Sequence, residues 1–83
     1  MDLKELRQQI DSIDDQLIAL FAQRMEVASK IGAYKKEHHL PVLDQGREEE
    51  KLNIVAAKAG PELAEATREL FQTLMQLSRE HQK

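Results

Sequence analysis

The architecture of this protein follows from residues 3–34, LKELRQQIDSIDDQLIALFAQRMEVASKIGAY. Side chains recur there with alternating spacings of three and four residues, the heptad pattern of a helix that packs along one seam. The seam positions are Leu3, Leu6, Ile10, Ile13, Leu17, Leu20, Arg24, Val27, Ile31 and Tyr34. The pattern predicts one helix over residues 2–37, which begins at the capping pair Asp2 and Glu5. We expect Gly32 to permit close packing of another helix, at a cost of about 1 kcal/mol in helix propensity.

Two shorter helices are expected after the long one. Pro41 breaks the first helix, and a second helix is expected over residues 44–58. Gly60 ends it, and Pro61 is expected in the first turn of a third helix over residues 61–82. No stretch shows the alternation of a strand. The sequence therefore predicts an all-α fold with three helices per chain.

The length of the first predicted helix, compared with the size of the domain, makes a dimer the simplest arrangement. We assign residues 1–83 to a single helical domain. About 35 helical residues span roughly 52 Å, whereas a compact globule of this size is only about 30 Å across. The long helix must extend beyond its own domain, and its apolar seam needs a partner. We expect an intertwined homodimer in which the long helices of both chains share one core.

Composition narrows the classes of function. The chain has no cysteine, so disulfides, thiolate chemistry and zinc-finger spacing are excluded. A net charge of −3 argues against nucleic-acid binding, and no apolar run is long enough for a membrane span. The N-terminus MDLKELRQQ shows no secretory signal, so we expect a cytoplasmic protein. No metal-ligand cluster is apparent, and His38, His39 and His81 are interpreted as solvated.

Charged and polar residues occupy inward positions of the predicted helices. Arg24 lies in the seam itself, where an unpaired guanidinium costs several kcal/mol, so a buried glutamate or an anionic ligand should meet it. Arg47 lies in the first turn of the second helix, where the helix dipole disfavours a cation. Taken singly, Arg7 or Lys35 is compatible with an exposed cation that pairs with an acid, and Ser78 and Gln82 with a frayed terminal turn. The full set is Arg7, Arg24, Lys35, Arg47, Glu48, Ser78 and Gln82.

Together these residues predict a pocket in which arginines bind a small polyanion. They lack the activated nucleophile that covalent catalysis requires. Arg24 and Lys35 lie about 16 Å apart along the predicted helix, within reach of one ligand. Arg7 lies about 25 Å from Arg24 and can join that ligand only from a second, roughly antiparallel chain. Two shared sites per dimer are therefore expected.

Four stretches resemble the all-helical class of chorismate mutases, which are small intertwined dimers of three-helix chains. They are LRQQIDSIDDQLIALFAQR, KIGAYKK, PVLDQGREE and LFQTLMQLSREHQ, at residues 6–24, 30–36, 41–49 and 70–82. The resemblance covers essentially the full length. It implies conversion of chorismate to prephenate, an intramolecular Claisen rearrangement in phenylalanine and tyrosine biosynthesis. Because the bond changes occur within one molecule, no cofactor is expected.

The resemblance also implies which residues bind the two carboxylates of chorismate. Arg7 would reach across the dimer to one carboxylate, while Arg24 and Arg47 would bind carboxylates within the chain. Ser78 would lie near the ring carboxylate.

The remaining positions would contact the ether oxygen and the ring hydroxyl. Lys35 would contact a carboxylate and the ether oxygen, and Gln82 would donate to that oxygen. Asp44 through its backbone and Glu48 through its side chain would bind the hydroxyl. Lys35, Gln82 and Arg24 are thus the expected catalytic residues.

Two other functions remain open. An isochorismate-pyruvate lyase would keep most of the cations, but Glu48 suits the hydroxyl of chorismate better. A non-catalytic module for dimerisation or effector sensing would use only the heptad seam, and would tolerate Arg24→Leu. The sequence also leaves open a partner enzyme of the shikimate pathway.

Overall fold

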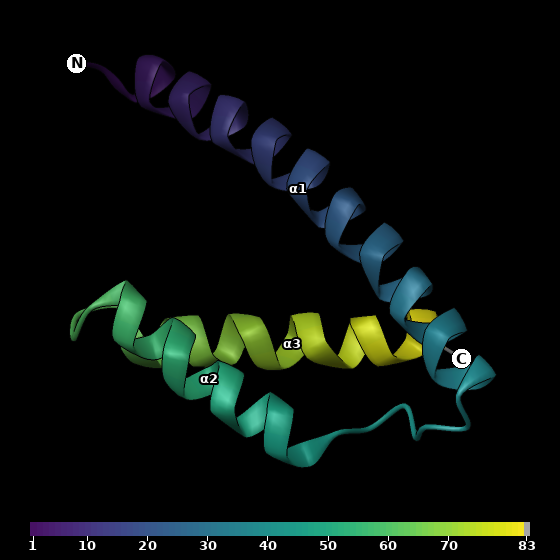
Figure 1. Ribbon diagram of the computed structural model, residues 1–83. Helices are drawn as coiled ribbons and strands as arrows, with labels where there is room; N and C mark the ends of the chain where they lie inside the picture. The colour runs from purple at the N-terminus through teal and green to yellow at the C-terminus, as the bar shows by residue number, and fades with distance from the viewer. Residues whose placement is uncertain (83) are drawn as a thin grey trace.

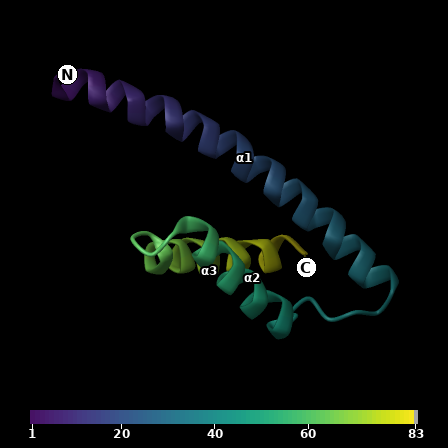
Figure 2. The same ribbon diagram turned by 60° about the vertical axis from the view of Figure 1, so that its left-hand side comes forward.

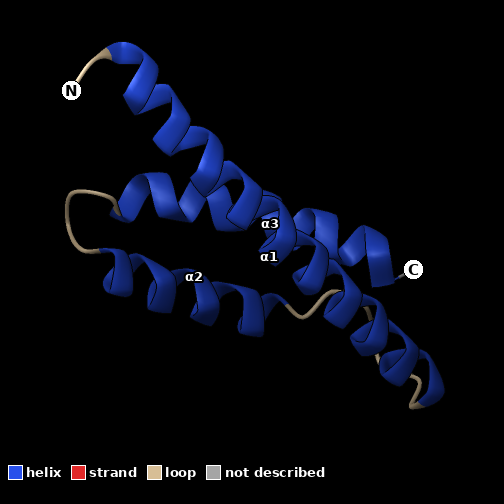
Figure 3. Cartoon of the chain, turned by 90° about the horizontal axis from the view of Figure 1, so that it is seen from above, coloured by secondary structure: helices blue, strands red, loops and turns tan. Residues whose placement is uncertain are grey.

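The computed structural model describes residues 1–82 and contains three helices (Figure 1). They are α1 at Leu3–Glu37, α2 at Gln45–Ala59 and α3 at Ala64–Gln82. No strand occurs among residues 1–82, as the colouring of Figure 3 makes plain, so the predicted all-α fold class is confirmed. Residue 83, the last of the predicted domain, lies outside the described residues. No helix in the described part of the chain combines the length and hydropathy needed to span a membrane.

Aspartate caps begin the first two helices. The Asp2 carboxylate accepts a hydrogen bond of 2.8 Å from the backbone N–H of Glu5, and Asp44 accepts one of 3.0 Å from that of Arg47. Each cap satisfies a backbone donor that has no partner within its helix. Gly60 then ends α2 with a φ of 86°, a backbone conformation that glycine adopts without steric cost.

The third helix begins later than the sequence predicted. Residues 61–63 form a turn in which the N–H of Leu63 donates to the carbonyl of Gly60 at 3.2 Å. The Leu63 carbonyl then accepts the first bond of α3 from Thr67 at 2.8 Å. Pro61 therefore lies outside α3, because the turn after Gly60 takes three residues before helical bonding starts.

The three helices form an open arrangement. The helices α2 and α3 run side by side in opposite directions, while α3 also packs against the C-terminal part of α1 (Figures 1 and 2). Within residues 1–82, α1 and α2 do not pack directly against each other. The N-terminal half of α1 stands clear of the other helices, so the chain measures 54 × 26 × 15 Å.

The core of the single chain is small and does not use the heptad seam. Its buried apolar side chains are Met25, Ala28, Val55, Ala56 and Met75. The apolar seam residues of α1 are instead exposed, from 43% at Leu6 to 60% at Leu3. A surface of this kind along a whole helix is typical of an interface. The homodimer remains a prediction that this exposed seam supports.

Candidate active site

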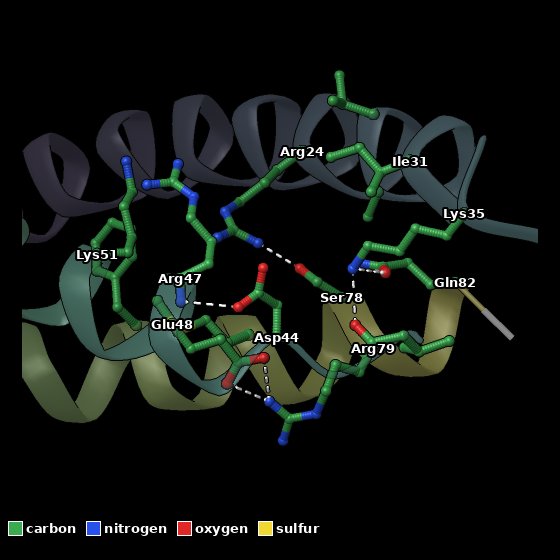
Figure 4. Close-up of a pocket in the computed structure, with 15 residues that line it drawn as sticks. Arg24, Ile31, Lys35, Asp44, Arg47, Glu48, Lys51, Ser78, Arg79 and Gln82 are labelled. Carbon is green, nitrogen blue, oxygen red and sulfur yellow. Dashed lines mark hydrogen bonds and ion pairs between the residues drawn. The ribbon is translucent and has the colours of Figure 1, made fainter. Parts of the chain in front are cut away.

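A cavity of about 440 Å³ lies between the C-terminal half of α1, the N-terminal half of α2 and the C-terminal half of α3 (Figure 4). It brings together seven of the eight residues that the sequence predicted, although they are far apart in the chain. The seven are Arg24, Lys35, Asp44, Arg47, Glu48, Ser78 and Gln82. The eighth, Arg7, is exposed on α1 and does not line the cavity.

Arg24 extends from α1 towards α3. Its Nη1 donates to the hydroxyl of Ser78 and, at 3.5 Å, to the carbonyl of Leu74, and its guanidinium lies 5.9 Å from the ring centre of Phe71. Ser78 is itself buried and donates to the Leu74 carbonyl at 2.7 Å. No carboxylate within residues 1–82 forms a salt bridge with Arg24, so the buried-glutamate alternative is not realised there. The guanidinium is oriented by neutral groups and keeps its charge for an anion.

Lys35 and Gln82 form the end of the cavity next to the α1–α2 connection. The Lys35 ammonium donates to the carbonyl of Val42 at 2.7 Å and to the amide oxygen of Gln82 at 3.0 Å. An ammonium has three donors, so one is left for a ligand. Because Gln82 uses its oxygen in this contact, its two amide N–H donors are also left. Two donor groups therefore converge at this end of the cavity.

The α2 wall presents a different arrangement. The Asp44 carboxylate caps α2, whereas the side chain of Arg47 makes no salt bridge with any carboxylate in the described residues. Glu48 is half-buried and accepts two contacts from Nη1 of Arg79, at 2.5 and 2.7 Å. The first turn of α2 therefore places one cation and one paired carboxylate at the cavity.

Sequence reasoning missed two cations that line the cavity, Lys51 and Arg79. Helical spacing could have identified Arg79, because it lies four residues after Met75 and three before Gln82, on the face of α3 that turns inward. Lys51 likewise lies three residues after Glu48 on α2.

The cavity differs in charge from the chain that contains it. Five cationic side chains and two carboxylates line the cavity, an excess of three positive charges, whereas the whole chain carries a net charge of −3. The apolar lining consists of Val27, Ala28, Ile31, Val42, Phe71 and Met75. A small molecule with an apolar ring and anionic groups fits this combination of surfaces.

The fold and the site together define an all-helical protein with a cationic pocket whose charge suits a small polyanion. The chain belongs to the chorismate mutase type II family, whose model matches residues 6–83. The family expected from the sequence is thereby confirmed.

Similar proteins support this assignment. The chain is 46% identical over 61 residues to the T-protein of Haemophilus influenzae, covering 70% of this chain and 16% of that protein. It is 37% identical over 76 residues to the bifunctional chorismate mutase/prephenate dehydratase of Escherichia coli K12, covering 89% of this chain and 20% of that protein. The chain thus spans a fifth or less of the length of these relatives.

A solved structure shares both fold and sequence. It is a conserved hypothetical protein from Pyrococcus furiosus, to which the chain is 43% identical with a TM-score of 0.79. The similarity covers 98% of this chain and 95% of that one, so the arrangement of all three helices is common to both proteins.

Proposed function

We propose that this chain is a chorismate mutase that converts chorismate to prephenate in phenylalanine and tyrosine biosynthesis. The proposal rests on one observation in a chain of this family: three cations that line the cavity have no carboxylate partner among the described residues. Arg24, Lys35 and Arg47 line it, yet none of them forms a salt bridge within residues 1–82. Chorismate carries two carboxylates and can supply the missing counter-ions.

The first task of such an enzyme is to fold a flexible dianion into its reactive conformer. In the proposed complex, Arg24 and Arg47 bind carboxylates, and Ser78 lies near the ring carboxylate. Glu48 and the backbone of Asp44 bind the ring hydroxyl. Contacts at opposite ends of one molecule restrict its rotation, and this positioning lowers the entropic part of the barrier.

The second task is to stabilise the transition state. In the rearrangement the C–O bond breaks ahead of C–C bond formation, so negative charge grows on the ether oxygen. Lys35 and Gln82, whose free donors converge at one end of the cavity, are the proposed donors to that oxygen. Donors that are already oriented favour the transition state over the ground state. The reaction needs no nucleophile and no cofactor.

The proposed active unit is a homodimer with two shared sites. Arg7 lies 17 residues before Arg24 on α1, about 25 Å along the helix, so it can complete only the partner's cavity. The exposed seam of α1 supplies the apolar surface for this dimer.

Glu48 favours chorismate over isochorismate as the substrate. It lines the cavity as a carboxylate, which can accept a hydrogen bond from the ring hydroxyl of chorismate. We therefore place an isochorismate-pyruvate lyase second. A cytoplasmic location and a partner enzyme that uses prephenate are part of the proposal, and the name of the E. coli relative, which pairs chorismate mutase with prephenate dehydratase, is consistent with such a partner.

The experiment that tests the proposal follows chorismate loss by ultraviolet absorbance with purified protein and identifies the product. We expect prephenate from the wild type and a loss of kcat/KM of at least about 100-fold for Arg24→Ala. The matched control is Arg68→Ala, which removes a surface arginine that contacts Asn53 outside the cavity. A folded, dimeric wild type without turnover would overturn the proposal, and pyruvate as the product from isochorismate would favour the lyase.

A further inference from the structure

The proposed contacts with chorismate leave two cations of the cavity unused, Lys51 and Arg79, and of these Arg79 forms a salt bridge within the described residues. It lies on α3 next to Ser78, and its guanidinium contacts both oxygens of Glu48 on α2. The side chains of Arg79 and Glu48 are 31% and 25% exposed. Within residues 1–82 the other salt bridge, Lys30 to Glu26, is 3.9 Å long and far more exposed. The Arg79–Glu48 pair is therefore short, partly buried and part of the cavity wall.

The geometry of the pair orients the Glu48 carboxylate. One nitrogen, Nη1 of Arg79, lies 2.5 Å from one carboxylate oxygen and 2.7 Å from the other. A carboxylate offers about four lone-pair sites, so two such contacts leave sites on both oxygens for another donor. Charge-assisted hydrogen bonds are also stronger than neutral ones and hold a side chain in place. Glu48 is thus restrained without losing its capacity to accept a hydrogen bond from a hydroxyl group.

Arg79 also balances the negative charge of Glu48 inside the cavity. A carboxylate in a cavity for a dianion repels the ligand and competes with it for the same cations. In Figure 4 the Glu48 carboxylate turns towards Arg79, on the side opposite to the side-chain ends of Arg47 and Lys51. Arg79 thereby supplies the counter-charge of Glu48 and leaves Arg47 without a carboxylate partner in the described residues.

We infer that Arg79 is a positioning residue, which holds Glu48 in the orientation that binds the ring hydroxyl of the substrate and keeps it away from the carboxylate-binding arginines. The inference rests on the proposed function. It assigns Arg79 no contact with substrate, so its effect must pass through Glu48.

The test is a double-mutant cycle on chorismate turnover, with Arg79→Gln, Glu48→Gln and the double variant. Glu48 contacts the hydroxyl in ground state and transition state alike, so its misplacement weakens uniform binding. We expect Arg79→Gln to raise KM about tenfold and to change kcat by less than about twofold. In the Glu48→Gln background, the same substitution should change KM by less than about twofold. Arg79→Lys, which keeps the charge, should recover most of the lost affinity.

The matched control is Arg68→Gln, the same substitution on the same helix. Arg68 also reaches α2, where it contacts Asn53 at 3.1 Å, but it does not line the cavity. We expect its KM to equal that of the wild type. Circular dichroism and sedimentation show whether each variant keeps its helix content and assembly state.

Three results would overturn the inference while the wild type is active. They are an unchanged KM in Arg79→Gln, a lowered KM, and an equal effect in the Glu48→Gln background. The lowered KM would mean that Arg79 competes with substrate for Glu48, and the equal effect would mean that Arg79 acts without it. A wild type that does not convert chorismate instead defeats the proposed function, and the inference with it.

Discussion

The backbone of Gln82 lies directly against Gly32. A Cβ atom at position 32 would lie 2.6 Å from both the Cα and the carbonyl oxygen of Gln82, closer than real Cβ atoms approach such atoms. The last turn of α3, which carries Gln82 to its contact with Lys35, therefore depends on the absence of a side chain in α1.

The substitution Gly32→Ala should favour the helical conformation of α1 and yet lower the activity. Alanine favours the helix by about 1 kcal/mol, but its methyl group must displace the backbone that carries Gln82. We expect kcat to fall by about 10- to 100-fold, because small misplacements of a donor are costly. Steady-state kinetics and thermal unfolding check both effects.

Gly46→Ala is the control for that substitution. A Cβ at position 46 would meet only Asp44 Oδ1, at an ordinary 3.8 Å. Unchanged kcat with equal or higher stability is the expected result. If Gly32→Ala behaves in the same way as Gly46→Ala, the close contact with Gln82 has no part in turnover.

Lys35→Ala should lower kcat by more than it raises KM. The ammonium lies 3.0 Å from the Gln82 amide oxygen and has a free donor for the ether oxygen. Charge on that oxygen grows towards the transition state, so the lost interaction is largely a transition-state interaction. We expect kcat to fall at least about 100-fold. A variant with normal kcat and raised KM would show that Lys35 only binds substrate.

The rate should not depend on pH near neutrality. The proposed donor Gln82 is an amide and does not ionise, so kcat should stay flat from about pH 6 to about pH 8. In Gln82→Glu the donor would be a carboxyl group, which donates only while protonated, and kcat should then fall as pH rises. Initial rates at saturating chorismate check both profiles. A steep wild-type profile would show that an ionisable group, and not Gln82 alone, controls turnover in this range.

Mixing two inactive variants tests whether the site is shared. In the proposed homodimer, Arg7→Ala and Arg24→Ala should each disable both sites. A mixed dimer would then have one intact site, made by Arg7 of the second chain and Arg24 of the first. After random exchange of subunits, half of the dimers are mixed, so about a quarter of the wild-type activity should return.

The control mixture combines Arg24→Ala with Arg47→Ala. Both residues line the cavity of a single chain, so every site in the mixed dimer lacks one of them and no activity should return. Recovery in both mixtures, or in neither, would be incompatible with a site completed by Arg7 of the partner.

Periodic and local features of the sequence were sufficient to predict the long first helix and the starts of the first two helices. The three-and-four spacing predicted α1, because helical geometry places such residues on one face whatever surrounds them. Asp2 and Asp44 predicted where helices begin, since a cap acts on backbone within three residues of itself. The prediction placed the start of α3 at Pro61, which is too early, because residues 61–63 form a turn before α3 begins at Ala64.

The contacts between residues of different helices could be identified only from the tertiary structure. The sequence by itself determined the fold class, the long seam and a set of inward cations, all of which follow from patterns within single helices. Only the tertiary structure decided that Arg79 pairs with Glu48 and that Gln82 rests on Gly32. Those contacts depend on the register and distance between packed helices, which side-chain packing sets across segments far apart in the chain.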